Sequence, residues 1–192
     1  MSDVDLKKRR LLQLAGIWGT LGVVGAASPF FSSLFPSRAS RMQAMPVKID
    51  LSSMQLGDQK TIMWKGKPIW VIKRSSTVVS SLKNPNYALR DPSSQQDQQP
   101  DYAKNYYRSI HPDYLVLVGL CTHLGCAPTY RPEKDSVEKD WPGGFFCSCH
   151  GSKFDLAGRV FTGVPAPTNL VVPPHYYVDE QTLVVGAGHP DE

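Results

Sequence analysis

All four cysteines of the 192-residue chain lie in two short clusters, and each cluster also contains a histidine. The clusters, called here the first box and the second box, are Cys121-Thr122-His123-Leu124-Gly125-Cys126 and Cys147-Ser148-Cys149-His150-Gly151-Ser152. Thiolate and imidazole groups are soft or borderline metal ligands, and packing alone gives no reason to gather six of them. One tetrahedral ion needs fewer ligands than that. The spacing C-x-H-x-x-C followed by C-x-C-H therefore predicts a metal centre built from both boxes.

A third motif follows the second box and is rich in proline: Gly163-Val164-Pro165-Ala166-Pro167-Thr168-Asn169-Leu170. With the two boxes in this order, most of the chain resembles the Rieske iron–sulfur proteins of cytochrome bc complexes. Such proteins hold a [2Fe–2S] cluster between two cysteines and two histidines. The resemblance implies an all-β Rieske fold, in which an antiparallel β base carries an inserted cluster-binding subdomain, here about residues 119–170. One N-terminal transmembrane helix would precede it.

The resemblance also implies a role for each cysteine and histidine of the boxes. In the family, two cysteines bind one iron, two histidines bind the other iron, and the remaining two cysteines form a disulfide beneath the cluster. By position, these three pairs are Cys121 and Cys147, His123 and His150, and Cys126 and Cys149.

Further residues are expected around the cluster on the same grounds. Ser152 matches a serine whose hydroxyl bonds a bridging sulfide, and Leu124 and Gly125 belong to the first box. Phe154 stands where many members have a tyrosine that bonds a ligand sulfur, so we expect a lower midpoint potential here; the alternative is a packing residue whose lost bond another donor replaces. The loop expected to cover the cluster contains Gly163, Pro165, Ala166 and Pro167, with Val164 inserted after the glycine.

The expected ligands imply an electron-transfer function. Two neutral imidazoles in place of two thiolates make a cluster less negative, which raises its potential to roughly −150 to +300 mV from about −400 mV. Rieske-type oxygenases and their ferredoxins lack the cysteines that match Cys126 and Cys149, so the chain resembles the respiratory branch. The resemblance implies a redox subunit of a quinol–cytochrome c oxidoreductase, inactive alone. It would take an electron from quinol, and a proton through His150, and would pass the electron to a c-type cytochrome.

The expected partners are cytochrome b and the c-type cytochrome within a dimeric membrane complex, with no nucleic acid. Three alternatives are open. A zinc-stabilised binding module would use Cys121, His123, Cys147 and His150 but gives the other cysteines no role. A domain with two disulfides would give neither box histidine a role. The small Rieske subunit of a periplasmic molybdenum oxidase fits the boxes, whereas the anchor and hinge argue against it.

The N-terminal segment has the composition of a membrane anchor. Residues 11–37 carry no charged side chain, and about 20 apolar residues suffice to span a bilayer. The basic tail, residues 1–10, indicates the cytoplasmic side, which would place the head on the periplasmic side of a bacterial inner membrane. Arg9 and Arg10 resemble a twin-arginine export signal. A cleaved signal peptide is the competing interpretation, and residues 38–46 are expected to form a hinge.

The head, residues 47–192, is expected to be rich in β-strands. Alternating or β-rich patterns predict strands at 47–51, 60–64, 68–72, 114–118 and 181–185, with a turn at 65–67 between the second and third. Residues 91–107 are polar and predict a surface insertion with one short helix.

The remaining charges and histidines suggest no second site. Residues 1–40 hold five basic and two acidic residues, so most of the net charge of +4 lies there and no nucleic-acid surface is indicated. The histidines outside the boxes are expected to be surface or loop residues and not ligands. The charged residues near the second box are expected to be solvated or to face a partner. The histidines are His111, His175 and His189, and the charged residues are Lys153, Asp155 and Arg159.

Overall fold

The computed structural model describes residues 3–188. The chain divides into two compact units, Met1–Met42 and Gln43–Glu192. The second unit, called the head, contains both boxes and the proline-rich motif.

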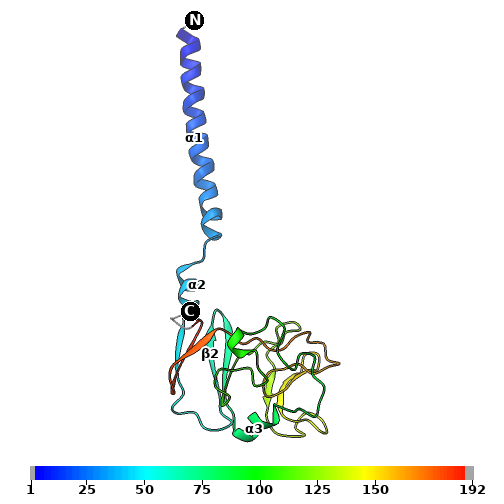
Figure 1. Cartoon of the computed structure of the whole chain (residues 1–192). Coiled ribbons are helices and arrows are strands. Elements are labelled where there is room, and N and C mark those ends of the chain that lie inside the picture. Colours follow the sequence, from blue (N-terminus) through cyan, green and yellow to red (C-terminus); the bar gives the residue numbers. More distant parts are fainter. Residues whose placement is uncertain (1–2, 189–192) are drawn as a thin grey trace. The chain divides into compact units, whose positions relative to one another are not determined.

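The first unit consists mainly of one long helix, α1 (Asp3–Ser33), drawn in blue in Figure 1. Large apolar side chains such as Leu11, Trp18 and Phe30 are each more than two-thirds exposed along it. A helix that is apolar without a protein partner requires lipid or another subunit around it. Among residues 3–188, only this N-terminal segment is long and apolar enough to cross a membrane.

A second, short helix, α2 (Arg38–Gln43), occupies most of the segment predicted as a hinge. The Ser37 hydroxyl accepts a hydrogen bond from the Ser40 backbone N–H, 3.1 Å away, which is how serine caps the start of a helix. The segment is therefore not wholly irregular. No side chain of α2 is buried, so within the described residues packing does not hold this helix in place.

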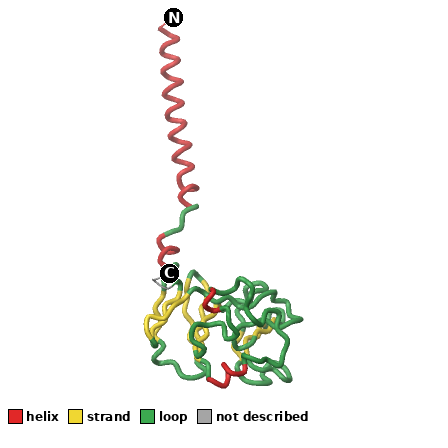
Figure 2. Tube along the Cα trace, in the orientation of Figure 1, coloured by secondary structure: helices red, strands yellow, loops and turns green. Residues whose placement is uncertain are grey.

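The described part of the head, up to residue 188, contains three three-stranded antiparallel sheets, and Figure 2 shows how much loop connects them. The first has the order β1-β9-β8, the second β2-β3-β4 and the third β5-β6-β7. Their bounds are β1 Val47–Asp50, β2 Gln59–Trp64, β3 Lys67–Lys73, β4 Tyr114–Val118, β5 Thr129–Arg131, β6 Gly144–Cys147, β7 Ser152–Phe154, β8 His175–Asp179 and β9 Thr182–Val185. The short helices are α3 (Ser76–Ser81) and the 3₁₀ helix η1 (Asp101–Ala103).

The predicted hairpin is confirmed: β2 pairs with β3 so that Trp64 lies opposite Lys67. The two residues between them, Lys65 and Gly66, have φ of 50° and 71°, as a tight two-residue hairpin turn requires. β4 has its predicted bounds, and β1 and β9 each differ from prediction by one residue. No pattern in the sequence predicted β5, β6, β7 or β8.

Two hydrophobic clusters lie on opposite faces of the second sheet. On β3, Ile69 and Val71 belong to the cluster shared with β1 and β9, whereas Trp70 belongs to the cluster shared with β6 and β7. Strands β3 and β4 are therefore buried on both faces, because successive side chains of a strand point to opposite faces. Trp70 stacks on Phe145 of β6 at a ring-centroid distance of 5.4 Å, so the sheet that carries the second box rests on the base.

The prediction that His175 is a surface or loop residue is wrong. Its side chain is fully buried on β8, with Nδ1 2.8 Å from the Pro173 carbonyl oxygen and the Tyr102 ring packed edge-on at 5.3 Å. Neighbouring prolines suggested a loop, but the strand begins at this residue. His111 is exposed, and His189 lies outside the described residues.

Burial of His175 is expected to make the head less stable in acid. Burial lowers the pKa of His175 from 6.5 to about 4, so below pH 6.5 the unfolded chain binds a proton that the folded chain does not. The contribution of His175 to the free energy of unfolding is complete above pH 6.5, the pKa of histidine in the unfolded chain. About 3 kcal/mol of it is lost as the pH falls from 6.5 to about 4. Denaturant unfolding of the detergent-solubilised chain at several pH values measures this loss. The loss should shrink by that amount in His175→Gln, and an unchanged pH slope would contradict it.

Candidate metal centre

The first box forms a tight loop directly after β4. The Cys121 N–H donates to the Cys126 carbonyl oxygen at 2.7 Å, and the Gly125 N–H donates to the Cys121 carbonyl oxygen at 2.9 Å. Gly125 has φ of +83°, which a side chain would disfavour. Two backbone hydrogen bonds therefore close the loop onto Cys121 and hold the backbone of Cys121 in place.

The second box forms the turn between β6 and β7 and repeats the same closure. Cys147 ends β6 and lies opposite Ser152, the first residue of β7. The Gly151 N–H donates to the Cys147 carbonyl oxygen at 2.9 Å, and Gly151 has φ of +76°. In both boxes the carbonyl oxygen of a cysteine thus accepts a hydrogen bond from the N–H of a glycine four residues later. The two loops therefore hold Cys121 and Cys147 with the same backbone hydrogen bond.

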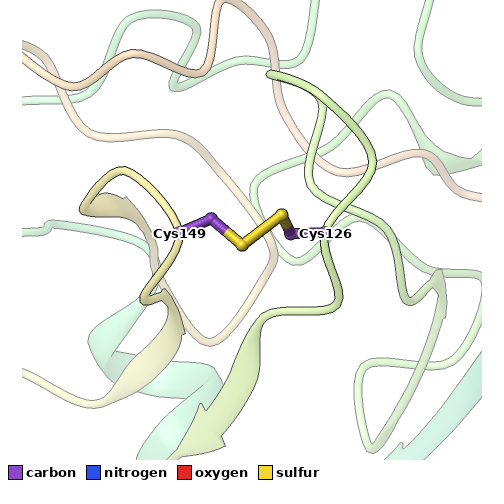
Figure 3. The surroundings of a disulfide bond; sticks show 2 residues. All are labelled: Cys126 and Cys149. Carbon is purple, nitrogen blue, oxygen red and sulfur yellow. A yellow bond between two sulfur atoms is a disulfide. The ribbon is translucent and has the colours of Figure 1, made fainter.

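A disulfide between Cys126 and Cys149 connects the two boxes, and Figure 3 shows it joining two separate loops. The Cα atoms are 6.7 Å apart and the cysteines are separated by 23 positions in sequence. The ligand atoms of Cys126, Cys147 and Cys149 all lie within 4.8 Å of one another. The disulfide therefore lies directly beside the Cys147 thiol.

The other two cysteines are free, buried and close together. Cys121 is 3% exposed and Cys147 is 2% exposed. Burial and a hydrogen bond with the Cys121 thiol raise the pKa of the Cys147 thiol, whereas backbone N–H groups of Cys149 and His150 act in the opposite direction. The structure thus brings two thiols, one from each box, into contact in the interior.

The two box histidines lie together on the outer side of the site. Their ring centroids are 4.8 Å apart and the rings are perpendicular, at 88°. His150 is exposed and His123 is partly exposed. A buried sulfur pair beside an exposed nitrogen pair is the donor set of a mixed-ligand [2Fe–2S] cluster, so the residues present fit this group.

The proline-rich loop forms hydrogen bonds with both boxes. The Ser152 hydroxyl, fully buried, accepts a hydrogen bond from the Ala166 N–H at 3.0 Å, and its own proton remains available for another acceptor. The Thr122 hydroxyl donates to the Thr168 carbonyl oxygen at 2.7 Å. Val164, the extra residue of this motif, is buried, so the loop accommodates it by burying an apolar side chain.

The remaining residues expected around the cluster differ in exposure. Phe154 is fully buried in the hydrophobic cluster that also contains Cys121 and Cys147. Leu124 is 72% exposed. Among the loop residues, Ala166 is buried, and Gly163, Pro165 and Pro167 are exposed.

The prediction that Asp155 and Arg159 are solvated charges is wrong. They form an ion pair with side chains 0% and 1% exposed, in the turn that follows β7. One carboxylate oxygen accepts from the Ala157 and Arg159 N–H groups, at 2.9 and 2.8 Å, and the guanidinium donates to the Leu82 carbonyl oxygen at 2.9 Å. The spacing Asp-x-x-Gly-Arg, typical of a tight turn, is the only sequence signal of this pair. Lys153 forms a partly exposed ion pair with Glu138 at 2.7 Å.

The polar insertion is also more buried than predicted. Within residues 91–107, Asp91, Ser94, Gln99 and Ala103 are buried. η1 is the one helical segment there, as expected. The buried side chains of Asp91 and Gln99 form hydrogen bonds with backbone groups of their own loop; for example, Gln99 Nε2 donates to the Ser94 carbonyl oxygen at 2.8 Å. This insertion is a packed part of the head.

Comparison with known proteins identifies the family. The family model described as Rieske [2Fe-2S] domain matches residues 93–174. The ubiquinol-cytochrome c reductase iron-sulfur subunit of Allochromatium vinosum is 48% identical over 183 residues, 94% of this chain and 88% of the relative. The subunits of the same name from Blastochloris viridis and Bradyrhizobium diazoefficiens are 39% and 35% identical, over 88% and 96% of this chain and 87% and 98% of those relatives. The chain therefore belongs to the family of Rieske iron–sulfur subunits of ubiquinol–cytochrome c reductase.

Proposed function

We propose that the head binds one [2Fe–2S] cluster, with Cys121 and Cys147 on one iron and His123 and His150 on the other. The observation that carries this assignment is the contact between two buried thiols, one from each box, together with the edge-to-face contact of the two box imidazole rings. Cys126 and Cys149 are unavailable as ligands because they are bonded to each other. A zinc module would leave this disulfide without a role in the site, and the family relationship does not favour it.

The chain then acts as the electron-transfer subunit of a quinol–cytochrome c oxidoreductase. When bound, the cluster supplies a one-electron acceptor of high potential. The exposed His150 ring is placed to accept a hydrogen bond from a quinol hydroxyl and to take up its proton, because an unprotonated imidazole nitrogen is a proton acceptor. The buried Val164 and Ala166 pack the covering loop over the site and limit water. A c-type cytochrome receives the electron, and cytochrome b is the other partner.

The assignment of ligands is tested by EPR of the ascorbate-reduced protein in its membrane, with iron and labile sulfide analysis. We expect a mixed-ligand [2Fe–2S] signal, with a high midpoint potential that depends on pH, and its loss in His123→Ala and His150→Ala. His111→Ala is the matched control, because His111 is an exposed histidine outside the boxes, and it should keep the signal. Zinc in place of iron would overturn the proposal.

The proton-accepting role of His150 needs a variant that keeps the cluster. His150→Cys retains a metal-binding atom but removes the imidazole. The added thiolate also lowers the midpoint potential. With the cluster verified by EPR, quinol oxidation should therefore fall at least about tenfold beyond what the measured drop in potential accounts for, within the range that positioned acid–base groups contribute. A normal rate with the cluster present would reject this role while leaving the cluster assignment intact.

Phe154→Tyr is expected to raise the midpoint potential by some tens of mV. A hydrogen bond to a charged group is worth roughly 1.5–3 kcal/mol, and about 1.4 kcal/mol corresponds to 59 mV for one electron. Only part of the bond energy differs between the oxidation states. Redox titration followed by EPR measures the shift, and Phe145→Tyr, at the residue opposite Phe154 on β6, is the control. An unchanged potential would show that Phe154 acts only in packing.

The anchor gives the proposed topology. We infer that α1 spans a bacterial inner membrane once, with Lys7 to Arg10 cytoplasmic and the head periplasmic, because cytoplasmic flanks are rich in Lys and Arg. Protease added outside intact spheroplasts should then digest the head, and protection of the head would refute this topology. Export of a head folded around its cluster through the twin-arginine route predicts that lysine at both Arg9 and Arg10 leaves the head inside.

Two further features of the assembly belong to this proposal. Residues 38–46 act as a hinge that lets the head move between its quinol and cytochrome partners, and α2, with no buried side chain, is compatible with such movement. A double-proline substitution there should slow turnover, and an unchanged rate would count against the hinge. The complex is dimeric, which the native mass of the solubilised assembly would test.

A further inference from the structure

Three arginines are buried in the head beyond the second box. They are Arg74, Arg108 and Arg159, which are 3%, 0% and 1% exposed. Arg159 is paired with the carboxylate of Asp155. Within residues 3–188, Arg74 and Arg108 form no ion pair, and the acceptors of their hydrogen bonds are uncharged oxygen atoms.

Arg74, which follows β3 directly, spans from the base to the turn after β7. Its guanidinium donates to the Pro112 carbonyl oxygen at 2.6 Å, the Ser109 hydroxyl at 2.9 Å, the Tyr107 carbonyl oxygen at 3.0 Å and the Leu156 carbonyl oxygen at 3.3 Å. The side chain thus neutralises no carboxylate through these bonds and leaves its charge in the interior.

Arg108, in the loop before β4, binds the same turn from another side. It donates to the Ala157 and Gly158 carbonyl oxygens at 3.2 and 3.3 Å, and to Gln99 Oε1 at 2.8 Å. The Gly158 carbonyl also accepts from the Leu170 N–H at 2.8 Å. Arg108 therefore joins the turn after β7 to the end of the proline-rich loop, and both flank the site.

The buried charges of this region do not balance. Within residues 3–188, two carboxylates are buried, those of Asp91 and Asp155, whereas three guanidiniums are buried. Asp91 is bound by the Gln95 and Gln96 N–H groups, at 2.8 and 3.0 Å. Burial lowers the pKa of Arg74 to about 10 and that of Arg108 to about 9, so both stay protonated at neutral pH. The interior next to the second box therefore carries an excess positive charge that water screens poorly.

We propose that the buried guanidiniums of Arg74 and Arg108 raise the midpoint potential of the cluster by stabilising the added electron through their charge. The inference rests on the proposed function, because it needs the cluster in the boxes. Both arginines bond the turn that continues β7, and β7 pairs with the strand that ends in Cys147. Neither guanidinium needs to contact the cluster, because a charge in a medium of low dielectric acts at a distance.

The test separates charge from packing by comparing glutamine with lysine at each position. In the full chain in its membrane, Arg108→Gln and Arg74→Gln should each lower the midpoint potential measured by EPR redox titration. Arg108→Lys and Arg74→Lys lose the planar fork and its bonds, so they should lower the melting temperature. Burial also lowers the pKa of a lysine, so the two lysine variants should keep most of the potential when it is measured at a pH at which the buried lysine is protonated. If Arg108→Gln assembles no cluster, the Arg74 pair gives the same comparison.

Lys153→Met is the matched control. It removes a cation one residue from Ser152, but this cation is partly exposed and already paired with Glu138, so its effect should be smaller and should fade with added salt. A glutamine variant with an intact signal and an unchanged potential would overturn the inference, as would equal shifts in the glutamine and lysine variants. Absence of the signal from the wild-type chain would instead refute the proposed function.

Discussion

Replacing Asp155 with asparagine should lower the free energy of unfolding of the head by about 3–5 kcal/mol, because removing one partner of a buried ion pair leaves the other charge uncompensated. The charge left without a partner is the guanidinium of Arg159, a residue that is 1% exposed. The substitution keeps the size of the side chain, so the loss reports charge and not a cavity. Denaturant unfolding followed by circular dichroism measures it in the detergent-solubilised chain.

The control for Asp155→Asn is Glu138→Gln. Glu138 also pairs with a basic side chain at 2.7 Å, but its side chain is 48% exposed, and exposed ion pairs contribute only about 0–1 kcal/mol. The double variant Asp155→Asn, Arg159→Met should recover part of the stability, since it removes the unpaired charge. Equal losses in Asp155→Asn and Glu138→Gln would show that burial does not govern the strength of the Asp155 pair.

Removal of the disulfide with serine at Cys126 and Cys149 should cost about 3 kcal/mol of stability, from the entropy of an unfolded chain no longer closed over 23 positions. The same change frees the two box loops, so we expect the EPR signal of the cluster to disappear at a lower temperature. Thermal unfolding followed by both circular dichroism and EPR records the two effects.

Either single serine variant should lose as much stability as the double variant, because one missing sulfur breaks the bond. Ser148→Ala is the control: Ser148 is an exposed neighbour of Cys149 in the same turn and takes no part in the bond. A double variant as stable as the wild type would mean that the closed backbone loops of the boxes hold the site without the disulfide.

The sequence predicted the strands of the β base other than β8, because those strands carry strong local signals. Residues 60–72 combine β-rich segments with a glycine-containing turn, and 114–118 is a continuous apolar run that becomes β4, buried on both faces. The third sheet had no such signal. β5 and β7 have three residues each, too few for alternation to be detected, and β6 ends inside the second box. Long-range pairing, and not local preference, makes these segments strands.

Burial of the charged residues was harder to predict than the boxes. Cys and His in close spacing indicate their chemistry directly, whereas Asp155 and Arg159 look like ordinary surface residues until the turn brings them together. His175 was misassigned for a related reason: adjacent prolines suggested a loop, yet its Nδ1 meets a backbone carbonyl two residues earlier. Partners supplied by folding decide whether a polar side chain can be buried.

Strands β3 and β4, which contribute side chains to both hydrophobic clusters, join the base and the cluster-binding subdomain into one cooperative unit. Opening the base would remove Trp70 and Leu117 from the packing that surrounds Cys121 and Cys147. The amides of these two strands should therefore exchange with solvent hydrogen only through global unfolding. Loss of the cluster and melting of the base then follow a single transition, so the redox centre survives for as long as the whole head does.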